Sequence, residues 1–137
     1  ILKTPEIPLP YGLIYLQGLE DLFDALPESI ATNVMRDVVK RFQLMLRWND
    51  IIARCDKLEF GVILPTTPEV SAIKTFERLL QALDKPVKLD TGDHISLSPV
   101  AGVVISRPDD SVETMSHRGE EAVNSARTGV SKLVVNK

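Results

Sequence analysis

Two apolar runs separated by a two-residue polar break constrain the fold of this chain more than any other feature of its sequence. The runs are residues 51–55 and 58–64, and the break is Asp56-Lys57. Such runs around a two-residue connection predict a β-hairpin. Along the second run, alternate apolar side chains should share a face that meets the core: Leu58, Phe60, Val62 and Leu64. Pro65 ends this strand, because proline cannot donate to a strand ladder.

Helical patterns flank this hairpin on both sides. Upstream, apolar residues recur at three- to four-residue spacing between Pro27 and about residue 50: Ile30, Val34, Val38, Phe42 and Met45. That spacing is typical of a helix that buries one face. Downstream, Thr66 and Glu69 form a capping-box pattern that predicts a helix ending near Leu83.

The rest of the chain adds shorter elements of both kinds. We expect a strand at 11–17, a short helix at 19–26, a second hairpin from 87–89 and 95–97, a strand at 100–106, a helix at 110–127 and a strand at 132–135. Asp110 with Glu113 is the capping pattern of the last helix, and Gly102 allows a close approach or a bulge. Helices interleaved with a central antiparallel hairpin predict the α+β class, with helices packed on a mixed sheet.

The chain's composition fits one soluble domain. Of its 137 residues, 44% are apolar and 26% charged, and no apolar run approaches the roughly 20 residues that span a bilayer. Pro5, Pro8 and Pro10 disfavour regular structure, so we expect a linker at 1–10 and a domain at 11–137. The start shows neither an initiator Met nor a signal pattern. We interpret the chain as a module of a longer protein that is cytoplasmic, or is the cytoplasmic part of a membrane-anchored protein.

Charge and residue types exclude several kinds of site. The net charge of −3 provides no basic field for nucleic acid or an anionic membrane, so neither is an expected partner. No metal or cofactor is expected, because His94, Asp90 and Asp93 lie in a polar loop that is typically just solvated. The single cysteine, Cys55, fits a reducing compartment and is interpreted as a buried strand residue. A nucleophilic role would need a nearby base, which His94 and His117 do not offer from their separate segments.

Residues 49–65 read NDIIARCDKLEFGVILP. This stretch resembles the core of a GGDEF domain, in which (S/N)D-apolar-apolar-ARxGGDEF-apolar-LP forms the active-site hairpin. Residues 126–129, ARTG, resemble the family's AKxxG element, and the similarity covers roughly residues 11–135. The resemblance implies a nucleotide-cyclase-like α/β sandwich with a mostly antiparallel central sheet flanked by helices. It also implies kinship with enzymes that condense two GTP molecules into cyclic di-GMP, using two Mg²⁺ ions held by carboxylates.

The same resemblance implies a degenerate catalytic site. The motif positions hold Asp56, Lys57, Leu58, Glu59 and Phe60. The metal-binding aspartate of the first strand corresponds to Tyr15, and the guanine-reading asparagine and aspartate correspond to Phe23 and Thr32. The terminal phosphate-binding pair falls near Ala126 or Arg127 and Val130. One remaining carboxylate cannot hold two Mg²⁺ ions, so the resemblance implies no cyclase activity.

A second motif precedes the hairpin. Arg47-Trp48-Asn49-Asp50 fits the family's RxxD inhibitory motif, whose arginine and aspartate bind cyclic di-GMP in members that have it. An arginine fork suits a guanine edge or a phosphate, and Arg78 lies about where some members supply a second arginine. The alternative interpretation is structural: Arg47 favours the end of the helix dipole, Asp50 caps the turn, and Trp48 is either exposed or packed under the hairpin.

These observations lead to ranked hypotheses. The preferred one is a catalytically inactive, GGDEF-like regulatory or interaction domain of a larger cyclic di-GMP signalling protein. Its partners would be neighbouring domains of the same polypeptide, a sensor or an EAL domain, with a homodimer also allowed. The alternative is a cyclic di-GMP receptor that works through Arg47, Asp50 and Arg78. An allosteric GTP-binding domain and an active diguanylate cyclase follow behind these two.

Overall fold

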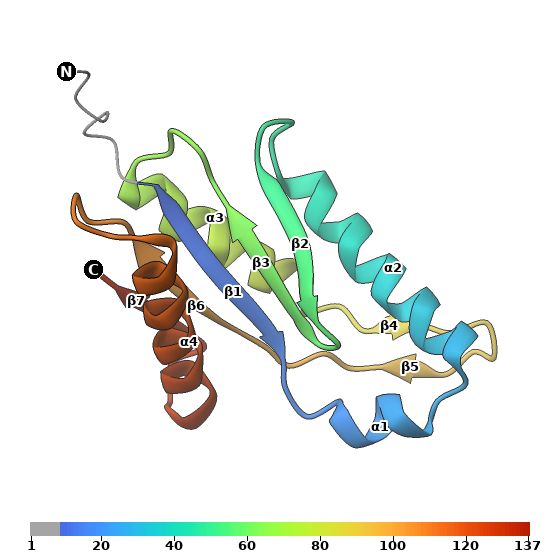
Figure 1. Cartoon of the computed structure of the whole chain (residues 1–137). Coiled ribbons are helices and arrows are strands. Elements are labelled where there is room, and N and C mark those ends of the chain that lie inside the picture. Colours follow the sequence, from blue (N-terminus) through green and yellow to red (C-terminus); the bar gives the residue numbers. More distant parts are fainter. Residues whose placement is uncertain (1–8) are drawn as a thin grey trace.

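The computed structural model describes residues 9–137 (Figure 1). Its elements are β1 (Pro10–Leu16), α1 (Glu20–Ala25), α2 (Glu28–Met45), β2 (Ile51–Asp56), β3 (Glu59–Ile63), α3 (Glu69–Ala82), β4 (Val87–Lys88), β5 (His94–Ile95), β6 (Pro99–Ile105), α4 (Val112–Thr128) and β7 (Leu133–Asn136). Pro10 opens β1, where its missing N–H is tolerated. The remainder of the expected linker, apart from Leu9, lies outside the described residues.

Five strands form the central sheet in the order β2-β3-β1-β6-β7, and β4 and β5 form a separate two-stranded ribbon. All neighbours in the central sheet are antiparallel except β6 and β7, which are parallel. α4 makes the crossover between these two strands, as a parallel pair requires. The predicted α+β class with a mostly antiparallel sheet is therefore confirmed.

Helices cover the two faces of the sheet unequally. The main core lies between one face and the helices α2 and α3, where Ile14 of β1, Phe42 of α2 and Phe76 of α3 belong to one cluster of buried side chains. A smaller cluster on the other face joins Leu13 to Val123 and other residues of α4. Figure 1 shows α4 crossing in front of β1, β6 and β7. Alternate residues of β1 thus face opposite helix layers, as the pleat dictates.

The hairpin predicted around residue 56 is β2–β3, and its second strand packs as expected. Leu58, Phe60, Val62 and Leu64 are 3%, 1%, 0% and 1% exposed, and Phe60 packs edge-on against Phe42 at 5.5 Å between ring centroids. The turn itself lies one residue later than expected, at Lys57-Leu58, because a register shift between Arg54 and Asp56 extends β2 through Asp56. The second predicted hairpin is present as the short β4–β5 ribbon.

Both predicted capping boxes are wrong in detail. α3 begins after Pro68, and Thr66 lies in the preceding turn with a φ of 51°, so it cannot cap the helix. α4 is capped by Ser111, which forms its box with Thr114. Asp110 is not available for this role, because its carboxylate accepts from Arg118.

The predicted burial of Cys55 is also wrong, since this side chain is exposed. β2 is an edge strand, and the face that carries Cys55 has no helix over it (Figure 1). Trp48, which the sequence left as either exposed or packed under the hairpin, is 97% exposed. Gly102 allows a close approach: a Cβ there would lie 2.2 Å from the backbone nitrogen of Val123 in α4.

Candidate functional site

The residues that correspond to the catalytic positions gather where β1 ends and α1 begins. Tyr15 of β1 lies opposite Glu59 of β3 in the antiparallel register. The Tyr15 hydroxyl donates to Oε1 of Glu20, and the Arg127 guanidinium carbon lies 4.1 Å from the centroid of the Tyr15 ring. A hydrogen bond and a cation–π contact therefore hold this phenol.

The pKa values at this end of the sheet shift in both directions. Burial, followed by the charges of Glu120 and Asp56, raises the pKa of Glu59, while Arg127 opposes the shift. Burial and the hydrogen bond to Glu20 raise the pKa of Tyr15. The same hydrogen bond lowers the pKa of Glu20. At neutral pH Tyr15 is therefore a neutral donor and not a metal-binding oxyanion.

The hairpin tip is bound by side chains of this chain itself. Lys57 Nζ forms an ion pair with Asp24 of α1, which ties the tip to the segment after β1. The Lys57 backbone N–H donates to Asp56 Oδ1 at 2.7 Å, and Arg54 Nε donates to the Lys57 carbonyl at 3.1 Å. Leu58 turns into the core, and its carbonyl accepts from the Leu16 N–H at 2.9 Å. In a GGDEF hairpin, glycines would leave this space free for a nucleotide.

The two positions that correspond to the guanine-binding residues, Phe23 and Thr32, do not supply two polar side chains that could hydrogen-bond to a base. Phe23 of α1 is 4% exposed and belongs to the main core. Thr32 lies exposed on α2. An aromatic ring buried in the core cannot hydrogen-bond to a base edge, so Phe23 is not available to read a guanine.

The donor set does not fit the two Mg²⁺ ions of an active cyclase. Within residues 9–137, no group of three or more His, Cys, Asp and Glu side chains is placed to hold a metal ion. Glu59 faces a protonated phenol, and Mg²⁺ requires oxygen ligands in near-octahedral geometry. The loop with His94, Asp90 and Asp93 is exposed, and its side-chain bond joins Thr91 to Asp93.

The structure brings Arg47 and Asp50 together. Arg47 Nη2 lies 2.8 Å from Asp50 Oδ1, and the Arg47 backbone N–H donates to Asp50 Oδ2, also at 2.8 Å. The same Nη2 donates to the Pro65 carbonyl at 3.0 Å and to the Thr67 hydroxyl. The hydrogen bond to Asp50 raises the pKa of Arg47. The pair thus links the turn after α2 to the loop before α3.

Exposure differs across this pair. The Asp50 side chain is 3% exposed and the Arg47 side chain 49%. Trp48 projects from the same turn. Arg78 is exposed on α3, about two and a half turns beyond the Thr67 end of that helix. This protomer therefore gathers Arg47 and Asp50 but places Arg78 apart from them.

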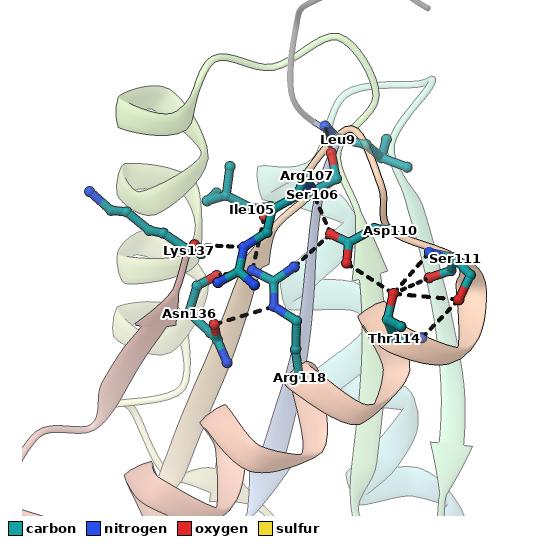
Figure 2. Close-up of polar contacts among 10 residues, drawn as sticks. All are labelled: Leu9, Ile105, Ser106, Arg107, Asp110, Ser111, Thr114, Arg118, Asn136 and Lys137. Carbon is teal, nitrogen blue, oxygen red and sulfur yellow. Dashed lines mark hydrogen bonds and ion pairs between the residues drawn. The ribbon is translucent and has the colours of Figure 1, made fainter.

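A buried ion pair at the opposite end of the sheet was not predicted from sequence (Figure 2). Arg118 of α4 is 7% exposed, and its Nη1 lies 2.5 Å from Asp110 Oδ2. Its Nη2 donates to the carbonyls of Ile105 at 3.2 Å and Asn136 at 3.0 Å. The only signal in the sequence is an arginine next to Gly119 on the apolar side of a helix.

The same network reaches both ends of the described chain (Figure 2). The Leu9 N–H donates to Ser106 Oγ at 2.7 Å, and Arg107 Nε donates to the Lys137 carbonyl at 2.9 Å. An open cavity of about 390 Å³ lies beside it, lined in part by Arg107, Asp110 and Arg118. These polar groups are already paired, so the network has a structural role: it connects the loop after β6 to α4 and β7.

Residues 13–131 match the family described as "Diguanylate cyclase, GGDEF domain". The chain belongs to the GGDEF domain family. This membership confirms the resemblance drawn from residues 49–65, and the fold agrees with it.

Known proteins resemble this GGDEF domain over 63% to 96% of its length. The protein y4lL of Sinorhizobium fredii is 25% identical over 134 residues, 96% of this chain and 16% of its own length. The diguanylate cyclase TpbB of Pseudomonas aeruginosa is 24% identical over 87 residues, 63% of this chain and 20% of its own length. The chain thus spans a fifth or less of the curated relatives it matches.

Solved structures share the fold. The GGDEF domain of PA1120 (YfiN or TpbB) from P. aeruginosa superposes with a TM-score of 0.87 at 20% identity, over 97% of this chain and 84% of that one. An EAL/GGDEF domain protein from M. capsulatus gives a TM-score of 0.85 at 16% identity, over 100% and 90% of the two chains. Among the described residues of the present chain, no helix is both long and apolar enough to cross a membrane.

Proposed function

We propose that this GGDEF domain is catalytically inactive and acts as a cytoplasmic regulatory or interaction domain of a larger cyclic di-GMP signalling protein. The observation that carries the proposal is the Lys57–Asp24 ion pair, which joins the hairpin tip to α1. In a GGDEF cyclase this space receives the nucleotide. Here a nucleotide would have to displace an ion pair and meet two side chains where the family has glycines.

The neighbouring contacts support the same conclusion. Tyr15 corresponds to the metal-binding aspartate, and it is engaged by Glu20 and Arg127. One phosphate-binding position falls near Ala126 or Arg127, and Arg127 stacks on that phenol. Glu59 alone cannot balance the charge of two metal ions. Metal, base and phosphate positions therefore all argue against the cyclase reaction. An EAL/GGDEF protein among the structural neighbours supports an EAL domain as a fused partner.

The proposal is tested by incubating the purified chain with GTP and Mg²⁺ and analysing the products by chromatography. We expect no cyclic di-GMP after prolonged incubation, with the diguanylate cyclase TpbB as the positive control. A thermal shift with GTP and Mg²⁺ in the same buffer tests the GTP-binding hypothesis, and we expect no change in Tm. Formation of cyclic di-GMP would refute the inactive assignment.

A second candidate function is reception of cyclic di-GMP at Arg47 and Asp50. The observation in its favour is that the two side chains already converge, with the Arg47 guanidinium half exposed. A guanine edge or a phosphate could meet that exposed side while Asp50 stays in place. Opposing it, Arg47 is already bound to Asp50, Pro65 and Thr67. A ligand would have to compete with these contacts.

This candidate has a built-in reporter, because the chain's single tryptophan, Trp48, lies inside the motif and is 97% exposed. Titration with cyclic di-GMP, followed by Trp48 fluorescence and by calorimetry, tests it. Arg47→Ala should abolish a true signal, while Arg54→Ala, an exposed arginine on β2, should leave it unchanged. Arg78→Ala tests the second arginine. Absence of heat and of a fluorescence change at high micromolar ligand would rule out the receptor function.

A further inference from the structure

One face of the central sheet is only partly covered. α2 and α3 pack on the first face, whereas α4 packs on β1, β6 and β7 of the second (Figure 1). On this second face no described element lies over β3 and β2. Two strands are about 10 Å wide, which is the diameter of one α-helix. The uncovered strip therefore has the width that one further helix would occupy beside α4.

The side chains on this strip are small or apolar. By register, Ile51 and Ala53 of β2 lie beside Ile63 and Gly61 of β3. Cys55 belongs to the same face, since its Sγ would lie 2.9 Å from a Cβ at Gly61. We call these five residues the open sheet face. Ile51 is 52% exposed, and Ala53 and Cys55 are also exposed. An apolar strip of this kind on a sheet normally packs against something.

Tyr11 and α4 form one wall of the open sheet face. The Tyr11 ring lies against α4, where a Cβ on Gly119 would come within 2.8 Å of it, and it also borders Gly61. The ring is only partly exposed. A helix laid on β3 and β2 would therefore have an aromatic side chain and the flank of α4 on one side and solvent beyond β2 on the other.

The rim of this face is acidic. Glu59 of β3, Asp56 of β2 and Glu120 of α4 all lie close enough for their negative charges to raise the pKa of Cys55. Besides burial, negative charges that include Glu120 and Glu59 raise the pKa of Tyr11 to about 12. Burial and then the charge of Glu59 raise the pKa of Cys55.

Three cations of the hairpin and of α4 make contacts of their own. Lys57 pairs with Asp24, Arg54 binds hairpin carbonyls, and Arg127 stacks on Tyr15. The open sheet face is therefore an apolar strip with Asp56, Glu59 and Glu120 at its rim, and Arg127 offsets part of the charge of Glu59. Charge complementarity favours a partner with cations flanking an apolar stripe. It disfavours a second copy of this chain, because a symmetric contact would bring the two acidic rims together.

We infer that the open sheet face docks a basic amphipathic α-helix of a protein partner. Apolar side chains of that helix would lie on Ile51, Ala53 and Cys55, and its lysines or arginines would meet Glu59 and Glu120. This inference rests on the interaction role proposed above and names the partner class for it. Binding of this kind combines an apolar centre with a charged rim, as protein interfaces commonly do.

The test uses a fluorescent 18-residue peptide that has leucine and alanine on one helical face and lysine on the other. Its binding to the whole chain is followed by anisotropy at two salt concentrations. We expect saturable binding that weakens with salt, and Ala53→Arg should weaken it about tenfold or more, because it places bulk and positive charge in the strip. Val70→Arg is the matched control, since Val70 is 64% exposed on α3, behind the opposite face of the sheet.

The single cysteine provides a second readout on the unmodified chain. Bound peptide should slow alkylation of Cys55 by iodoacetamide several-fold, because the thiol lies under the proposed helix. Equal binding of a peptide with glutamate in place of lysine would overturn the inference, and so would full binding by Ala53→Arg or unchanged alkylation of Cys55. A concentration-dependent dimer that Ala53→Arg abolishes would assign the face to self-association instead.

The two proposals fail in different assays. Cyclic di-GMP formed from GTP would refute the inactive assignment without reference to the peptide. A chain that makes no cyclic di-GMP and also ignores the basic peptide would refute only the docking inference. Circular dichroism of Ala53→Arg verifies that the fold is retained, and the alkylation assay needs no variant.

Discussion

At the scale of single residues, Arg118 shows how a buried charge is accommodated. Its guanidinium is almost out of contact with water, yet its bonds reach Asp110, two backbone carbonyls and the Asn136 side chain. A buried ion is tolerated only when its hydrogen-bonding capacity is used in this way. Removing the arginine would take this donor from the carbonyls and from Asn136, and would leave Asp110 with only the Arg107 N–H and the Thr114 hydroxyl as donors.

Arg118→Met should therefore lower Tm by roughly 10 °C, since removing one partner of a buried pair is strongly destabilising. Arg118→Lys should fall between this variant and wild type, because lysine keeps the charge but loses the fork. Thermal unfolding followed by circular dichroism measures both. Arg107→Ala, which removes an exposed arginine from the same loop, is the control and should shift Tm by only a degree or two. Equal effects of the two substitutions would contradict the structural role of Arg118.

Glu59, unlike Arg118, lies in surroundings that disfavour its charged form. Its pKa is raised above the ordinary value of 4.5, first by burial and then by Glu120 and Asp56, with Arg127 opposing. A carboxyl with a raised pKa in the folded state binds its proton more tightly there than in the unfolded chain. Its ionisation therefore costs stability above the folded pKa, and the cost disappears as the pH falls below 4.5.

Glu59→Gln removes this cost. We expect the variant to have a higher Tm than wild type at pH 7, with the difference vanishing near pH 4, where both forms are neutral at this position. Thermal melts across this pH range provide the measurement. Glu77→Gln, which changes an exposed acid on α3, is the control and should leave Tm at pH 7 close to the wild-type value. A variant less stable than wild type at pH 7 would mean that Glu59 makes a favourable contact as an anion.

At the scale of elements, the packing of α4 on β6 depends on Gly102 of β6 having no side chain. A Cβ at Gly102 would lie 2.2 Å from the Val123 nitrogen and 2.6 Å from the Ala122 carbonyl carbon. Both are backbone atoms, so a change of rotamer cannot relieve the clash. α4 would have to move away from the sheet as a body.

Gly102→Ala should destabilise the domain by about 3 kcal/mol through this overpacking. Gly92→Ala is the contrast, because Gly92 has nothing within 4 Å of its added Cβ but a φ of +94°, so backbone strain alone should cost about 1 kcal/mol. Urea denaturation of both variants gives the comparison. A smaller loss at Gly102 than at Gly92 would show that α4 adapts more easily than its backbone contacts suggest.

The elements that sequence predicted well are those with a one-sided apolar period. Val34, Val38 and Phe42 mark α2, and Phe60 with Val62 marks β3, because burial of one face imposes the period directly. Local capping patterns were less informative, since Asp110 is recruited by Arg118, eight residues away. Such a choice depends on how the loop meets the helix, and no local pattern encodes it.

In the candidate site, too, some contacts were predictable from the sequence and others were not. The convergence of Arg47 and Asp50 was predictable, because three-residue spacing at a helix end brings two side chains together. The exposure of Cys55 was not, since it depends on which strands α4 covers. The Lys57–Asp24 ion pair joins residues 33 positions apart, and it follows from the placement of α1 beside the hairpin tip.

At the scale of the whole molecule, the two ends of the described chain lie at the same end of the sheet. Leu9 binds Ser106, and Lys137 binds the adjacent Arg107 (Figure 2). Tyr15 and Glu59 lie at the other end, where β1 leaves the sheet at Leu16. The two ends of the described chain are thus separated from Tyr15 and Glu59 by the length of the strands.

This arrangement predicts tolerance of circular permutation. Joining Leu9 to Lys137 through a linker of about six glycine-rich residues, and opening the chain at the exposed Gly92-Asp93 turn, should preserve the fold. Circular dichroism and the urea midpoint measure the outcome. A permutant opened between Gly61 and Val62, inside β3, is the control and should not fold. Failure of the first permutant to fold would mean that a short linker cannot join Leu9 to Lys137 without straining the domain.

The bonds of Arg118 also impose an order on the making of this domain. The ribosome delivers Asp110 before Arg118, so their ion pair can form as soon as both have emerged. Asn136, which supplies two further acceptors, is synthesised 18 residues later. Until it arrives, the guanidinium has only part of its final set of partners and β6 lacks its parallel neighbour. A nascent chain stalled within this interval would therefore hold an incomplete sheet edge, the kind of intermediate that chaperones bind.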